Sequence, residues 1–195
     1  NKTSHIKLTD YIQSVAEKKS ENEVRKTVLH AVVYHLRRYN PNDIQLSRID
    51  KDYILGFLDY LKTAKQTHTK KEKLLHVNTQ VYYYKMLRYC LNYAVSEELI
   101  SANPMNKIKN EEKPHKHRTE REYLTIDELR KLAQTPFYNG LLKKAFLFSC
   151  FCGLRHSDII ALTWGDIEMD DDGNFRLYII QKKTKEAISL PLSQE

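Results

Sequence analysis

The sequence lacks any hydrophobic run that could cross a membrane, because no apolar stretch approaches the roughly 18 residues that a membrane-spanning helix needs. The opening residues, NKTSHIKLTD, do not have the pattern of a signal peptide. Cysteine is scarce, and the odd count of three suggests a reducing compartment. We therefore expect a cytoplasmic protein without a membrane partner.

The sequence also lacks the ligand spacing of a metal site. Cys150 and Cys152 lie two positions apart on a predicted helix, so they point to different faces. No set of further Cys or His residues completes a zinc site around them. We interpret both cysteines as small core residues and expect neither a metal nor a cofactor.

Acidic charge is low in the first part of the chain. Residues 1–118 carry 22 Lys and Arg against 13 Asp and Glu, a net charge of +9, whereas residues 119–195 carry 10 against 12, a net charge of −2. A basic region of this kind favours a polyanionic partner, with nucleic acid the leading candidate. The alternative from charge alone is a solvated, lysine-rich helical surface.

With 41% apolar residues, the 195-residue chain can bury a core in one large or two small domains.

Hydrophobic periodicity predicts four helices in the basic part, near residues 8–18 and within 20–40, 47–65 and 78–100. Ser20 and Glu23 resemble a capping box for the second helix, and Asn78 or Thr79 is expected to cap the fourth. The predicted apolar stripes contain Val28 or Leu29, Val32 or Val33, Leu36 and Tyr39, then Ile54, Phe57, Leu58 and Leu61, and finally Tyr83, Leu87, Leu91 and Ala94.

Residues 101–121 break this periodicity with two prolines, many charges and almost nothing to bury. We therefore predict a helical domain over 1–106, a basic linker over 107–121 and a second domain over 122–195. The second domain should begin with a helix capped by Thr125 and Glu128, followed by two helices that meet near Gly153. Residues 175–192 then alternate as a pair of strands around a polar turn. The expected fold class is mainly α with a small β-hairpin.

Two motifs in the second domain, GLRHSDIIALTWGDI (153–167) and IIQKKTKEAISLPL (179–192), closely resemble those of the tyrosine recombinase (integrase) family. NTQVYYYKMLRYCLNYAVSEELISANP (78–104) is similar to the last helix of that family's core-binding domain. The resemblance implies a SAM-like helical core-binding domain, followed by the N-terminal part of an α+β catalytic domain. It also implies a bacterial, phage or mobile-element origin and double-stranded DNA as the partner.

The resemblance assigns catalytic roles to Arg155 and Lys183. Enzymes of this family attack a DNA phosphodiester with a tyrosine, which forms a 3′-phosphotyrosine and releases a 5′-hydroxyl. Arginine can stabilise the charge on the phosphate oxygens, and we expect the apolar neighbours of Arg155 to hold it rigid and partly dry. Its alternative role is that of a salt-bridged core arginine. Asp158, one helical turn on, is expected to orient Arg155 or its helix, and His156 to be a bystander.

The hairpin lysine is expected to protonate the leaving oxygen as a general acid. The residue before Thr184 matches best, which selects Lys183, but a one-residue slip in the alignment would select Lys182. In the first case Lys182 and Lys185 contact phosphates or are merely solvated in the turn.

Exposed positions of the second and fourth helices and the basic linker are the predicted DNA contacts. A solvated helix face is the alternative for each helical position. The linker, which also includes His117, is expected to cross the phosphate backbone. The candidates are Lys26, His30, Tyr34, Arg37, Thr79, Lys85, Arg88, Lys113, Lys116 and Arg118.

The family pattern continues beyond the hairpin with a His-x-x-Arg helix and the nucleophilic tyrosine, whereas this sequence ends at Glu195. We therefore expect a fragment that is monomeric in solution and binds DNA without cleaving it, cut from a recombinase that is tetrameric on DNA. One alternative is a DNA-binding regulator that shares the fold without the chemistry. A second is a helical interaction module whose basic charge is incidental.

Overall fold

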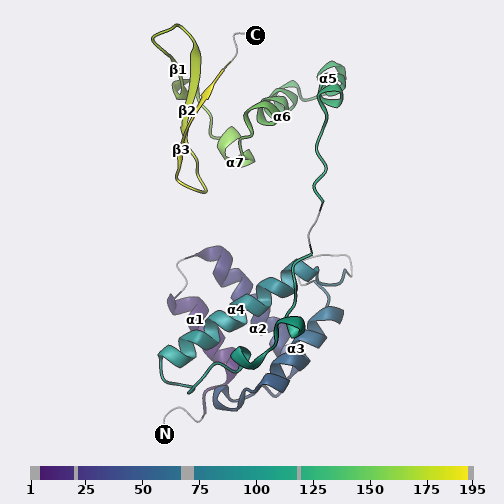
Figure 1. Cartoon of the computed structure of the whole chain (residues 1–195), viewed down its shortest axis with the longest axis vertical. Helices are drawn as coiled ribbons and strands as arrows, with labels where there is room; N and C mark the ends of the chain where they lie inside the picture. The colour runs from purple at the N-terminus through teal and green to yellow at the C-terminus, as the bar shows by residue number, and fades with distance from the viewer. Residues whose placement is uncertain (1–4, 20–21, 67–72, 118–119, 193–195) are drawn as a thin grey trace. The chain divides into compact units, whose positions relative to one another are not determined.

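The computed structural model describes residues 5–19, 22–66, 73–117 and 120–192, and the chain divides into two compact units, residues 1–119 and 120–195 (Figure 1). The first unit contains four α-helices. Within it α2 packs against α1, α3 and α4, and α3 also packs against α4. The helices are α1 (Leu8–Lys19), α2 (Glu23–Tyr39), α3 (Lys51–Thr63) and α4 (Val77–Ser96), with short 3₁₀ turns at Leu46–Arg48, Pro104–Lys107 and Asn110–Glu112.

The core of the first unit forms from the stripes that the periodicity predicts. On α2 the buried apolar side chains are Leu29, Val32, Val33 and Leu36, on α3 they include Ile54, Phe57 and Leu61, and on α4 they include Tyr83, Leu87, Leu91 and Ala94. A Cβ atom at Gly56 on α3 would collide with the Tyr39 hydroxyl, so a larger residue there would require the Tyr39 side chain to shift. The four predicted helices form, and their core is continuous across all of them.

The helix caps differ in part from the prediction. Ser20 lies outside the described residues, and the Asn22 side chain accepts hydrogen bonds from the backbone N–H groups of Val24 and Arg25 at the start of α2. The expected cap of α4 is wrong, because the helix begins at Val77 and His76 Nδ1 accepts from the Asn78 N–H. The Asn78 side chain is instead engaged with a later segment of the chain, as described below.

The expectation that residues 101–121 bury almost nothing is also wrong. Met105 is fully buried and Ile108 nearly so, and both belong to the core of the first unit. Asn103 caps the 3₁₀ turn that begins at Pro104. Lys51 on α3 forms a 2.8 Å ion pair with Glu112. This bond and the Lys109 backbone N–H hold the pKa of Glu112 below its usual range.

A buried histidine lies among aromatic side chains where α2, α3 and α4 meet. His35 is 1% exposed, its Nδ1 lies 3.2 Å from the Tyr60 hydroxyl, and its ring is also close to those of Tyr34 and Tyr83. Its Nε2 atom has no hydrogen-bond partner among the described residues. Burial, and secondarily the charge of Arg38, lowers the pKa of His35 to about 4.

This pKa makes the first unit sensitive to acid. Above pH 6.5 the imidazole is neutral in both states, so it does not make stability depend on pH. Between pH 6.5 and 4 the unfolded chain binds a proton that the folded chain does not, which should cost about 3 kcal/mol of unfolding free energy. His35→Gln should remove this part of the pH dependence in urea denaturation. His30→Gln, on the exposed face of the same helix, should retain it, and equal acid sensitivity of the two variants would contradict the assignment.

The second unit combines three α-helices with a small antiparallel sheet. The elements are α5 (Ile126–Gln134), α6 (Gly140–Cys152), α7 (His156–Ile159), a 3₁₀ turn at Trp164–Asp166, β1 (Ile167–Met169), β2 (Phe175–Ile180) and β3 (Ala187–Pro191). The strand order is β1-β2-β3, and Ile179 pairs with Ile188 in the hairpin. The predicted Thr125–Glu128 capping box and the break after α6, where Gly153 adopts φ 64°, are confirmed. The fold class is therefore mainly α with a small sheet, as predicted.

The second unit buries few apolar side chains. Among its described residues only Leu129, Leu154 and Leu177 are buried hydrophobics. Cys150 is exposed and Cys152 half-buried, so the prediction that both are core residues is wrong. α6 is apolar around most of its circumference, and the described residues of the second unit cover only part of it. No helix in the described part of the chain has the length and apolar character needed to cross a bilayer.

Candidate DNA-binding surface and catalytic residues

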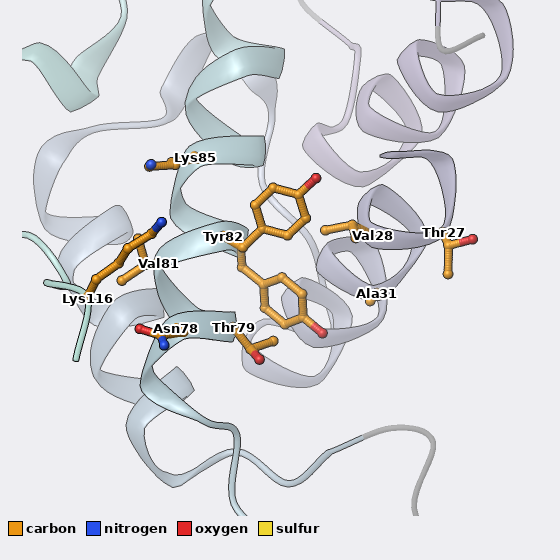
Figure 2. A pocket seen from close by; sticks show the side chains of 10 residues that line it. Thr27, Val28, Ala31, Asn78, Thr79, Val81, Tyr82, Lys85 and Lys116 are labelled. Carbon is orange, nitrogen blue, oxygen red and sulfur yellow. The ribbon is translucent and has the colours of Figure 1, made fainter. Parts of the chain in front are cut away.

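A surface groove runs between α2 and α4 in the first unit. Figure 2 shows the Tyr82 side chain between α4 and Val28 of α2. Three of the predicted DNA contacts, Thr79, Lys85 and Lys116, line this one groove. The groove brings together residues from α2, α4 and the segment that follows the 3₁₀ turns. Its lining consists of Thr27, Val28, Ala31, Asn78, Thr79, Val81, Tyr82, Tyr83, Lys85 and Lys116.

Lys116 reaches the groove because Asn78 holds the chain beside it. The Asn78 Oδ1 atom accepts a 3.0 Å hydrogen bond from the His117 N–H, and Asn78 Nδ2 donates to the His117 carbonyl oxygen at 3.4 Å. This pair of bonds fixes the backbone next to Lys116 against the first turn of α4. Asn78 was expected only as a helix cap, and the sequence gives no signal for a contact 39 residues away.

The predicted contacts on α2 lie outside the groove lining. His30 and Tyr34 are exposed and Lys26 is half-buried. The Tyr34 ring lies under the Arg38 guanidinium, 5.6 Å from its centroid. Arg37 is directed to α1, because it donates to Gln13 Oε1 at 3.0 Å and lies 3.7 Å from an Asp10 carboxylate oxygen.

The remaining candidates of the first unit are dispersed. Arg88 donates to the Asn106 side chain at 3.0 Å. Lys113 lines a different groove, whose other charged lining residues are Asp59, Lys62, Glu111 and Glu112, so acidic side chains lie near it. Arg118 lies outside the described residues.

In the second unit, Arg155 sits immediately before α7 and reaches the hairpin turn. Its Nη1 donates a 2.7 Å hydrogen bond to Gln181 Oε1, and the same oxygen accepts from Thr184 Oγ1 at 2.6 Å. Gln181 is buried, so it is a fixed support. It links the candidate arginine to the turn that carries the lysines, a contact that the sequence analysis missed because Gln181 is 26 positions away.

Asp158 makes a second link between α7 and the turn. It is 4% exposed, and its Oδ1 accepts a 3.0 Å hydrogen bond from the Lys182 backbone N–H. This contact agrees with an orienting role. Lys182, Lys183 and Lys185 are all exposed, and Lys185 adopts a positive φ of 61° that closes the turn. Exposure therefore does not distinguish Lys183 from Lys182.

The expectation that apolar neighbours partly shield Arg155 from water is wrong. Arg155 is exposed, and nearby Phe151 and Trp164 are 72% and 89% exposed. The reason is that Leu154 alone of its adjacent apolar residues is buried. Among the described residues, no cluster of three or more His, Cys, Asp or Glu side chains has the arrangement of a metal site.

Comparison with known proteins identifies the first unit. A family model described as the phage integrase SAM-like domain matches residues 7–113. The chain belongs to the phage integrase, or tyrosine recombinase, family. The match covers α1 to α4 and both 3₁₀ turns that follow, so the integrase domain includes the buried Met105 and Ile108. No curated protein sequence matched this integrase family member.

Solved integrase structures share the fold. A lambda integrase tetramer bound to a Holliday junction matches with a TM-score of 0.70 and 20% identity, over 96% of this chain and 50% of that one. The Tn1549 transposon integrase in complex with circular intermediate DNA matches with a TM-score of 0.66 and 13% identity, over 97% of this chain and 61% of that one. The chain thus spans about half to three fifths of the length of these integrases.

Proposed function

We propose that this protein is a site-specific DNA recombinase whose first unit binds duplex DNA through the face of α2 and α4. The observation that carries the proposal is the convergence of Thr79, Lys85 and Lys116 on one groove of an integrase-type domain. The unit that bears the groove has a net charge of +9 over residues 1–118. Lysine side chains at such a surface neutralise phosphates, and hydroxyl and apolar groups between them can contact base edges.

The second unit contributes chemistry in this proposal. Arg155 would stabilise the negative charge on the phosphate in the transition state, since only Gln181 among the described residues accepts a hydrogen bond from it. Its other N–H groups remain available for phosphate oxygens. Lys183 would protonate the leaving 5′-oxygen after a tyrosine attacks the phosphodiester. We further propose that the natural protein acts in the cytoplasm, as a tetramer on DNA.

Salt dependence of binding tests the proposed DNA surface. The 195-residue chain should bind duplex DNA with an affinity that falls linearly on a log–log plot as salt rises. Lys85→Ala combined with Lys116→Ala should weaken binding and reduce the slope by about 1.8, because two phosphate contacts are lost. Lys62→Ala removes an exposed lysine on α3 that pairs with Asp59, and it should leave the slope unchanged. Equal slopes for the double variant and the wild type would exclude this surface.

Asn78 should influence DNA binding through Lys116. Asn78→Ala removes both hydrogen bonds to His117, so Lys116 is no longer held beside the groove. We expect the salt slope to fall by about 0.9, as for Lys116→Ala. Combining Asn78→Ala with Lys116→Ala should lower the slope no further. Fluorescence anisotropy at several salt concentrations measures the slopes. An additive loss in the double variant would show that Asn78 and Lys116 act separately.

A further inference from the structure

The floor of the groove between α2 and α4 is apolar although it faces outward. Val28 and Ala31 on α2 are half-buried, and Tyr82 on α4 is 39% exposed. Val81 and Tyr83 complete the floor, and the hollow has a volume of about 580 Å³. Exposed apolar surface within a polar rim is typical of a binding surface.

The rim of the groove carries cations and hydroxyl groups. Lys85 and Lys116 are both exposed at this rim, while Thr27 and Thr79 add hydroxyl and methyl groups. A ligand that complements both features must be a polyanion that also presents an apolar group. On the base edges of the DNA major groove, the one apolar group is the 5-methyl of thymine, which Ala, Thr and larger apolar side chains contact.

We infer that this groove holds the 5-methyl group of a thymine in the major groove of the target DNA, an inference that rests on the proposed DNA-binding function. Val28, Ala31 and Tyr82 surround the methyl group, and Lys85 and Lys116 contact the flanking phosphates. The groove is then a specificity-determining site. Burial of one methyl should strengthen binding about fourfold, which corresponds to the ~0.8 kcal/mol for burying one CH₂ group.

Replacement of thymine by deoxyuridine tests the inference, because it removes the methyl and keeps the base pair. Tight-binding duplexes would first be selected from a random library with the 195-residue chain, and each thymine would then be replaced in turn. We expect about fourfold weaker binding at one or two positions. If every deoxyuridine duplex binds as tightly as its parent, the inference is wrong. Salt-dependent binding would still support the proposed function, whereas its absence would overturn both.

Variants within α2 assign the effect to the groove. Val28→Thr keeps the shape of the side chain but replaces one of its two methyl groups with a hydroxyl, so it should reduce the preference for thymine over deoxyuridine without changing the salt slope. Ala31→Ser should act in the same way. Val24→Thr is the matched control, since Val24 is 66% exposed one turn earlier and does not line the groove. Loss of the preference in Val24→Thr would contradict the inference. The inference would also be contradicted if the protein self-associates without DNA and Val28→Thr abolishes this self-association. The groove would then bind a second copy of the chain.

Discussion

Replacing Lys183 with alanine in the natural protein is expected to slow DNA-strand cleavage by about 10²–10⁴-fold, the usual contribution of a general acid. The lysine lies at the exposed apex of the turn between β2 and β3, where it can approach a phosphodiester. Cleavage would be measured as the rate at which a covalent protein–DNA adduct forms on a labelled duplex. Lys182→Ala is the matched control in the same turn and should have a much smaller effect.

A modified substrate tests whether Lys183 acts as an acid. If the leaving 5′-oxygen is replaced by sulfur, the leaving group is a better one and needs little protonation, because thiols are far more acidic than alcohols. Lys183→Ala should then cleave at nearly the wild-type rate. A loss that persists on the sulfur substrate would indicate phosphate binding instead. A larger loss in Lys182→Ala than in Lys183→Ala would transfer the role to Lys182.

The second large effect is expected for Arg155. Arg155→Ala in the natural protein should lower the rate of cleavage by about 10²–10³-fold, the loss that follows removal of one donor to a charged transition state. Arg155→Lys should recover little, because a lysine cannot reproduce the planar fork of the guanidinium. Single-turnover measurement at saturating protein separates this effect from DNA binding, which should change little.

Gln181 provides a test of how Arg155 is positioned. Gln181→Ala removes the 2.7 Å hydrogen bond to Arg155 and the bond from Thr184 to the same oxygen. We expect a smaller loss of rate than in Arg155→Ala, and no additional loss when the two substitutions are combined. Full activity of Arg155→Ala would refute the catalytic assignment, whatever the outcome for Gln181.

The sequence predicted the helices of the first unit well because their cores repeat at helical spacing. The stripe of Ile54, Phe57 and Leu61 is continuous, and α3 forms around it. Residues 101–112 were misjudged for the opposite reason. Two isolated apolar residues, Met105 and Ile108, have no periodicity, and only the packed helices show that they are buried. The strand β1 was missed because three residues are too few for an alternating pattern to be recognised.

The sequence predicted individual site residues but not the contacts that bring them together. Lys113 and Lys116 look equivalent in the sequence, yet one lies beside acidic residues and the other lines the α2–α4 groove. The difference depends on Asn78, whose contact with His117 spans 39 positions. In the same way, Arg155 could be chosen from its motif, but its bond to Gln181 depends on how α7 and the hairpin pack. Contacts between distant segments carry no local sequence signal.

The uneven distribution of buried side chains has a consequence for synthesis of the protein. The core of the first unit is complete once Ile108 has been added, whereas the second unit encloses only three buried hydrophobic residues in its described part. A ribosome adds about 5–20 residues per second, so residues 120–195 take about 4–15 s to emerge. The helical unit therefore has time to fold before they are complete. Residues of the second unit, Phe151 and Trp164 among them, therefore emerge after the helical unit has had time to bury its own apolar side chains.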